Sequence, residues 1–135
     1  MPVLVDTGVL YALADRDDDW HERATEYLDD TDDMLLVPVT VIPEVTYLLK
    51  ARLGDRAERT FVASLAAGEL GVEPLTALDL KRCDAVLVRY PALGFVDASL
   101  VAMAERLRVR TLATTDRRHF AQVRPAHLPR FTLVP

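Results

Sequence analysis

Four carboxylates stand apart from the other acids of this 135-residue chain. Most of the 21 acidic residues lie in polar clusters, but four are the single acid of a largely apolar or hydroxyl-rich segment: Asp6, Glu44, Asp97 and Asp116. Carboxylates brought together repel one another, so their pKa values rise unless a cation neutralises them. Oxygen ligands suit Mg²⁺ or Mn²⁺. An ion of this kind can activate a water molecule and neutralise the charge of a phosphodiester during its hydrolysis.

The first of these acids ends the opening stretch of the chain. An apolar strand is expected at residues 3–5, Asp6 follows it, and Thr7 and Gly8 lead into a helix over residues 9–14. In open α/β sheets, chemistry gathers outside the carboxyl ends of the strands. An aspartate at this place is also a common helix cap. The sequence therefore leaves two interpretations of Asp6, a site carboxylate and a cap.

The other three acids occupy similar positions. Glu44 is the only charged residue of the segment 37–49 and lies early in a helix expected from residue 40 or 43 to about residue 52. Asp97 lies in the first turn of an expected helix, residues 95–104, which is apolar nearly all round and therefore buried. Asp116 follows Thr114 and Thr115 after a strand at residues 110–113. Strands and helices alternate, so these ends are expected to meet at one edge of a sheet.

The remaining elements complete this alternation. Further strands are expected at residues 34–37, 72–75 and 131–134, and further helices around residues 20–28, over 55–67 and from 76 to about 90. Asp79 and Asp84 belong to the last of these helices and are interpreted as a cap and a surface residue.

Composition places the chain among globular proteins. Half of the residues are hydrophobic and 27% are charged, and the whole of residues 1–135 is expected to form a single domain. No apolar run approaches the roughly 20 residues of a membrane span, and the first residues do not resemble a signal peptide. Cys83 is the only cysteine, which excludes an internal disulfide. A cytoplasmic protein is expected.

Charge is unevenly distributed along the chain. Residues 15–33 contain ten acids and two arginines, a local net charge of −8, whereas residues 106–130 contain seven arginines and only one acid, Asp116. A solvated basic surface is the ordinary interpretation of such a run. An arginine-rich segment around a single carboxylate can also hold a polyanion close to that acid.

The four acids in this order resemble the PIN-domain nucleases. The resemblance covers essentially the whole chain and rests on Asp6-Thr7, the helical Glu44, Phe95-Val96-Asp97-Ala98 and Thr114-Thr115-Asp116. The segments 93–99 and 114–120 are similar to those of the VapC toxins of bacterial toxin–antitoxin pairs. Some relatives carry a further acid just after the fourth, and here Arg117, Arg118 and His119 occupy that stretch.

The resemblance implies an α/β, PIN-like three-layer fold with a mainly parallel sheet flanked by helices. It also implies an endoribonuclease dependent on Mg²⁺ or Mn²⁺, with Asp6, Asp97 and Asp116 at the metal and Glu44 completing the acidic pocket. Thr7, Thr115 and Arg117 would then support a water molecule or a phosphate. The implied partners are an RNA substrate, a VapB antitoxin gripped partly by residues 51–68, and a second copy of the chain in a homodimer.

Two other functions are considered. A phosphatase of the haloacid dehalogenase type also begins with a strand-end aspartate, but it requires a second aspartate where this chain has Gly8. No glycine-rich phosphate loop supports a nucleotide switch. A non-catalytic domain of the same fold, which binds RNA or a partner protein, stays open as the alternative.

Overall fold

Five parallel strands form the centre of the protein in a computed structural model that describes all 135 residues. The strands are β1 (Pro2–Val5), β2 (Met34–Pro38), β3 (Gly71–Glu73), β4 (Thr111–Ala113) and β5 (Thr132–Val134). Their order in the sheet is β3-β2-β1-β4-β5, and every neighbouring pair is parallel. The strand β1 is therefore central, and Val3, Leu4 and Val5 are buried.

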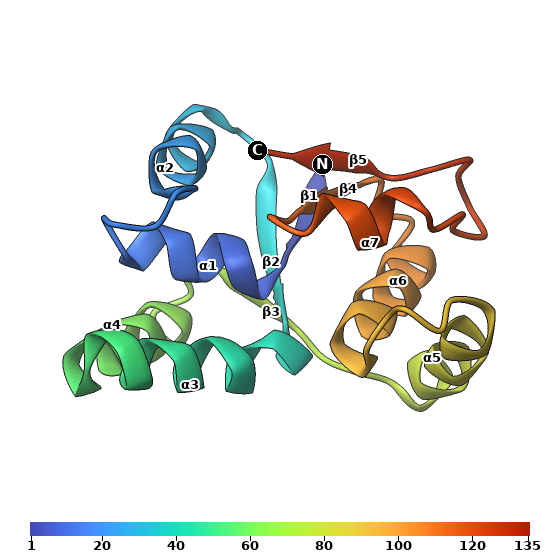
Figure 1. Cartoon of the computed structure of the whole chain (residues 1–135), viewed down its shortest axis with the longest axis horizontal. Coiled ribbons are helices and arrows are strands. Elements are labelled where there is room, and N and C mark those ends of the chain that lie inside the picture. Colours follow the sequence, from blue (N-terminus) through green and yellow to red (C-terminus); the bar gives the residue numbers. More distant parts are fainter.

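The helices lie on both sides of this sheet. They are α1 (Thr7–Ala14), α2 (His21–Asp30), α3 (Ile42–Leu53), α4 (Asp55–Ala66), α5 (Ala77–Arg89), α6 (Phe95–Leu107) and α7 (Arg117–Ala121), with a 3₁₀ turn η1 (Val39–Val41) before α3. Figure 1 shows α1 to α4 on one side and α5 and α6 on the other. The chain first proceeds outward from the central β1 through β2 to β3, and then returns to the other side of β1 to form β4 and β5. Because such connections are right-handed, the helices of these two halves lie on opposite faces of the sheet. The predicted three-layer α/β fold is confirmed.

The core is one cluster of 27 buried residues between these layers. Seven consecutive residues of α6, from Ala98 to Ala104, are buried, so the prediction of a helix covered on all sides is correct. The buried middle of α6 anchors the helix, and its first turn, with Asp97, is only partly covered. None of the helices has the length and the apolar character that spanning a lipid bilayer requires.

Two details differ from the sequence-based expectations. The sequence did not indicate α7, whose five residues are too few to show a helical period. The strand β3 ends at Glu73, two residues before the expected end.

Asp79 caps its helix as predicted, in a reciprocal capping box with Thr76. Asp79 is also buried, with only 2% of its surface exposed. The guanidinium of Arg106 on α6 pairs with it, with Nε 2.9 Å from Oδ1. Burial raises the pKa of Asp79, but the hydrogen bonds from Arg106 and Thr76 outweigh this effect and the pKa is lowered. Arg106 thus joins α6 to the start of α5 and is not free to hold a polyanion.

Candidate active site

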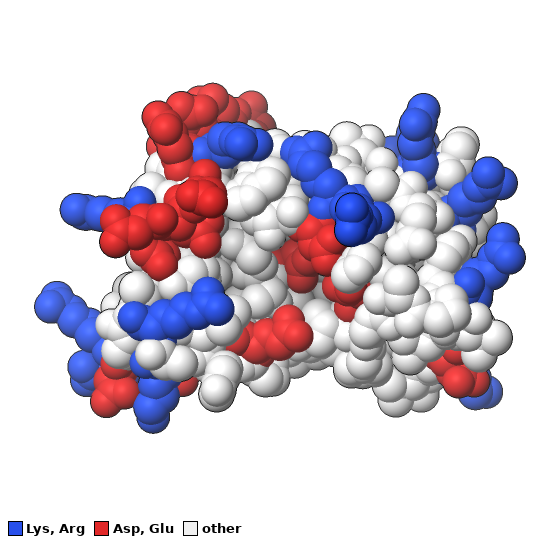
Figure 2. All heavy atoms as spheres, viewed as in Figure 1, with Lys and Arg blue, Asp and Glu red and all other residues white.

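The four isolated acids meet at the carboxyl edge of the sheet, where the strand order changes direction. Asp6 follows β1, Asp116 lies just beyond the neighbouring β4, and Glu44 and Asp97 lie in the first turns of α3 and α6. Figure 2 shows acidic atoms in a central hollow of this face, between the helices of the two halves. Ligands of open α/β sheets bind in the crevice at such a switch point.

Asp6 is the most deeply buried of the four, with 7% of its surface exposed. Its Oδ1 accepts a hydrogen bond from the Thr7 backbone N–H at 2.8 Å, and its Oδ2 accepts one from the Thr114 hydroxyl at 2.9 Å. Desolvation by burial raises the pKa of Asp6 to about 6, although these two hydrogen bonds oppose the rise and repulsion from Asp97 and Glu44 adds to it. Asp6 therefore caps α1 and belongs to the acidic group, so both interpretations of the sequence hold.

Thr114 fixes two of the acids relative to each other. Its buried hydroxyl donates to Asp6 and accepts a hydrogen bond from the backbone N–H of Asp116 at 3.0 Å. The Asp6 backbone N–H also donates to the carbonyl of Ala113 at 2.8 Å, which extends the pairing of β1 with β4 to the site.

Asp97 and Asp116 form a close group with His119. The Nδ1 atom of His119 lies 2.7 Å from Asp116 Oδ2 and 3.5 Å from Asp97 Oδ2. One ligand atom from each of the three residues lies within 4.8 Å of the others, and Asp6 is not part of this tightest set. Burial, followed by repulsion from Asp116, raises the pKa of Asp97, while the nearby His119 opposes the rise.

Glu44 reaches the group through Thr7. The Thr7 hydroxyl donates a hydrogen bond of 2.6 Å to Glu44 Oε1, while the backbone of the same residue holds Asp6. Glu44 is exposed. It is therefore the carboxylate of the four that a ligand from solvent can reach most directly.

Thr115 packs against the start of α1. A Cβ atom placed on Gly8 would lie 2.1 Å from the Thr115 hydroxyl oxygen, closer than any two such atoms can approach. The glycine therefore permits the close contact between α1 and the segment after β4. This is a packing role at the site, and it also explains why a second acid is absent at position 8.

The side chain of Arg117 contacts residues other than the four acids. Its guanidinium donates to the carbonyl of Pro135 and lies 5.7 Å from the centre of the Trp20 ring. No lysine or arginine forms a salt bridge with Asp6, Glu44, Asp97 or Asp116. Apart from His119, the four carboxylates thus have no basic side chain that balances their charge.

Such a donor set fits a divalent cation. Carboxylate oxygens that are close, partly buried and without a basic partner are the ligands that hard cations take. The raised pKa values of Asp6 and Asp97 show the cost of keeping this charge without an ion. The site can therefore bind a divalent ion and place it beside an anionic substrate.

The sequence-based list of site residues omitted Thr114 and His119. Thr114 lies in the motif that was recognised, and its buried position at the end of β4 gives it a hydrogen-bonding role. His119 lies three residues after Asp116, and residues at this spacing share a helix face. The three-residue spacing of Asp116 and His119 could have indicated a shared site, but only once the helix α7 is known, and the sequence did not predict α7.

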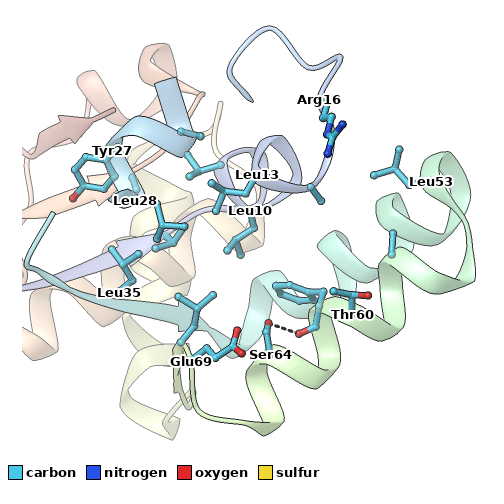
Figure 3. Close-up of a pocket in the computed structure, with 18 of the residues that line it drawn as sticks. Leu10, Leu13, Arg16, Tyr27, Leu28, Leu35, Leu53, Thr60, Ser64 and Glu69 are labelled. Carbon is cyan, nitrogen blue, oxygen red and sulfur yellow. Dashed lines mark hydrogen bonds between the residues drawn. The ribbon is translucent and has the colours of Figure 1, made fainter. Parts of the chain in front are cut away.

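A second hollow, of about 870 Å³, lies away from the acids on the side of the sheet that carries α1 to α4. Fourteen of its 19 lining residues are hydrophobic. Figure 3 shows Leu10 and Leu13 of α1 and Leu28 of α2 on one side of it, with Thr60 and Ser64 of α4 opposite. Arg16, Arg56 and Glu69 also line it. It is an apolar groove with charged groups among its walls.

The chain matches known proteins over nearly its full length. The family described as the PIN domain matches residues 3–125. Ribonuclease VapC26 of Mycobacterium tuberculosis is 33% identical over 135 residues, which cover 98% of this chain and 100% of that protein.

Solved structures agree with this result. The M. tuberculosis toxin VapC20, described as cleaving the sarcin–ricin loop, superposes with a TM-score of 0.80 at 24% identity and covers 87% of this chain and 92% of its own. A toxin–antitoxin complex from Klebsiella pneumoniae gives a TM-score of 0.69 at 19% identity, with 96% and 99% covered.

The raised pKa of Asp6 predicts an unusual dependence of stability on pH. In the metal-free protein the folded state holds the proton of Asp6 more tightly than the unfolded state, so stability falls as the pH rises from about 4 to about 6. Asp6→Asn removes this penalty. Urea unfolding at pH 7.5 should show the variant roughly 2–3 kcal/mol more stable than the metal-free wild type, with the difference absent below pH 4.

The exposed Asp84 of α5 provides the control, because Asp84→Asn should change stability by less than about 0.5 kcal/mol at either pH. A wild type that is more stable than Asp6→Asn at pH 7.5 without metal would contradict the analysis of the site.

Proposed function

Because this chain belongs to the PIN domain family, we propose that it is a metal-dependent endoribonuclease that acts as the toxin of a toxin–antitoxin pair. Its similarity to a ribonuclease of the VapC group supports the activity. The observation that carries the proposal is the meeting of four isolated carboxylates at one sheet edge without a lysine or arginine to balance them.

The residues have distinct roles in this proposal. Asp6, Asp97 and Asp116 hold Mg²⁺ or Mn²⁺, and Glu44 completes the acidic pocket. The ion supplies a Lewis acid that lowers the pKa of water and neutralises charge on the phosphodiester. Thr7 and Thr114 keep Asp6 in a fixed orientation, and Thr7 also positions Glu44, which is exposed and can accept a proton from an attacking water molecule.

RNA is the proposed substrate. Six arginines of the segment 106–130 are exposed: Arg108, Arg110, Arg117, Arg118, Arg124 and Arg130. None of them forms a salt bridge with an acid. Arg117 and Arg118 directly follow Asp116 and can neutralise phosphates next to the acidic site, whereas Arg108 and Arg110 lie at the opposite ends of α6 and β4. The acidic segment 15–33 gathers around α2 and repels the phosphates (Figures 1 and 2). Arg117 is proposed to support the substrate from this rim.

Cleavage provides the direct test. Purified protein without antitoxin should shorten RNA in the presence of Mg²⁺ or Mn²⁺ and stop when a chelator is added. Asp6→Asn and Asp97→Asn should each lower the rate by about 10²-fold or more, which corresponds to roughly 2.7 kcal/mol. Gel analysis of a labelled RNA under single-turnover conditions measures the rates.

The matched control is again Asp84→Asn, which should cleave at the wild-type rate. A protein that binds RNA equally with and without the ion and never shortens it would instead be the non-catalytic alternative. Full activity in either site variant would show that the metal ligands are assigned wrongly.

We further propose that a VapB-type antitoxin binds the apolar groove of α1, α2 and α4. One structural neighbour of this chain is a toxin–antitoxin complex, which supports such a partner. Arg16 and Arg56 among the groove walls can pair with acidic residues at the ends of an apolar segment. The groove includes Leu53, Arg56 and Phe61, which belong to the expected grip at residues 51–68.

A homodimer is the proposed assembly of the toxin. The helix α5 exposes the apolar side chains of Leu78, Leu80 and Val88, and a second copy that covers α5 would remove them from water.

Groove variants test the partner. Leu28 lines the groove and is 39% exposed, whereas Val62 lies outside it and is 48% exposed. A charge at Leu28 must be desolvated when an apolar segment covers it. Leu28→Glu should therefore weaken binding of the antitoxin encoded beside the toxin by at least about tenfold, and Val62→Glu should not. Calorimetry with the purified partners measures both, and equal binding by wild type and Leu28→Glu would place the antitoxin elsewhere.

A further inference from the structure

We propose that His119 is a direct ligand of the divalent ion and gives this site a preference for Mn²⁺ over Mg²⁺. The inference rests on the proposed function, because it assumes that Asp97 and Asp116 bind an ion. It assigns a nitrogen ligand to a site that otherwise offers only oxygen.

The distances around His119 are those of neighbouring ligands. Around an ion with ligands at about 2.1 Å in octahedral geometry, adjacent ligand atoms are about 3.0 Å apart. The Nδ1 atom of His119 lies 2.7 Å from Asp116 Oδ2 and 3.5 Å from Asp97 Oδ2, one distance on each side of that value. One atom from each residue lies within 4.8 Å of the other two.

The direction of the His119 ring supports the same conclusion. Its Nδ1 atom is shielded from solvent, yet neither carboxylate is aligned with it as a hydrogen-bond partner. A ligand atom directs its lone pair at the ion and not at the next ligand, so a short but misaligned contact is expected between two ligands of one ion. Only one other buried ring nitrogen of the protein lacks a partner, on His127, and no acid pairs with that residue.

The short helix α7 holds the two ligands in register. Asp116 caps this helix, and its Oδ1 accepts a hydrogen bond from the His119 backbone N–H at 3.3 Å. Its Oδ2 remains free to face the imidazole. The next residue, Phe120, is fully buried and anchors the helix in the core. The carboxylate and the imidazole are therefore held together by the backbone of one helical turn.

The chemistry of the ligands sets the preference. Mg²⁺ takes oxygen ligands almost exclusively and gives up its water reluctantly. Imidazole is a borderline-soft donor, and Mn²⁺, which begins the series of transition ions whose affinity for nitrogen ligands rises toward copper, accepts it more readily than Mg²⁺ does. Replacing one oxygen by a nitrogen therefore weakens the site for Mg²⁺ relative to Mn²⁺ and leaves room for the carboxylates of Asp6, Asp97 and Asp116.

Spectroscopy of bound Mn²⁺ tests the assignment without measuring activity. Electron spin echo envelope modulation detects a coordinating nitrogen as a ¹⁴N coupling. We expect this coupling in wild type and in Arg118→Ala, whose exposed side chain lies next to His119 in the sequence. We expect it to be lost in His119→Ala and in His119→Asp, which restores an oxygen ligand.

Calorimetric titration with MnCl₂ and MgCl₂ gives the second readout. His119→Ala should weaken Mn²⁺ binding by about 10- to 100-fold and Mg²⁺ binding by less than about threefold, whereas His119→Asp should bind Mg²⁺ more tightly than wild type.

The outcomes separate this inference from the proposed function. Tight Mn²⁺ binding by wild type without a ¹⁴N coupling would overturn the role of His119 and leave the metal-dependent nuclease intact. A coupling that persists in His119→Ala would also overturn it. No binding of either ion would remove both proposals together.

Discussion

The burial of carboxylates that no lysine or arginine balances is the constraint on which the candidate site depends. Burial and, to a lesser extent, neighbouring acids raise the pKa values of Asp6 and Asp97 above their usual range. No lysine or arginine forms a salt bridge with either carboxylate. A protein of ordinary stability, some 5–15 kcal/mol, can keep such a group only if the remainder of the fold holds it in place. The buried β1, the buried middle of α6 and the anchored α7 supply that support. An ion bound at the site relieves the repulsion, so the same charges that weaken the free protein favour its binding.

The topology explains why these acids converge although they are distant in the chain. The order β3-β2-β1-β4-β5 places β1 beside β4, so the ends of the first strand and of a strand more than 100 residues later become neighbours. Thr114 then ties Asp6 to the backbone of Asp116, and Thr7 ties Asp6 to Glu44. The hydroxyl groups near the acids thus carry most of the positioning, and they do so without adding charge.

The sequence was sufficient to predict the large elements and the grouping of the four acids. It was insufficient to predict details that depend on contacts between residues distant in the chain. The apolar β1 and the all-round apolar α6 have patterns that only a buried element explains, so both were predicted correctly. The burial of Asp79 was not predicted, because its partner Arg106 is 27 residues away and no local pattern connects them. His119 was not assigned to the site, because its place depends on α7, a helix too short to show a period. Arg117 was expected at the substrate, and its contacts in the structure are with Trp20 and Pro135.

The central claim is that one divalent ion lies among Asp6, Asp97 and Asp116. The most direct measurement is an anomalous difference map from crystals of the protein soaked in MnCl₂ and recorded near the manganese absorption edge. The account predicts a peak bounded by carboxylate oxygens of these three residues at about 2.2 Å, the bond length of a hard divalent ion. A map with no peak there, or with manganese only on the acidic surface of α2, would contradict it.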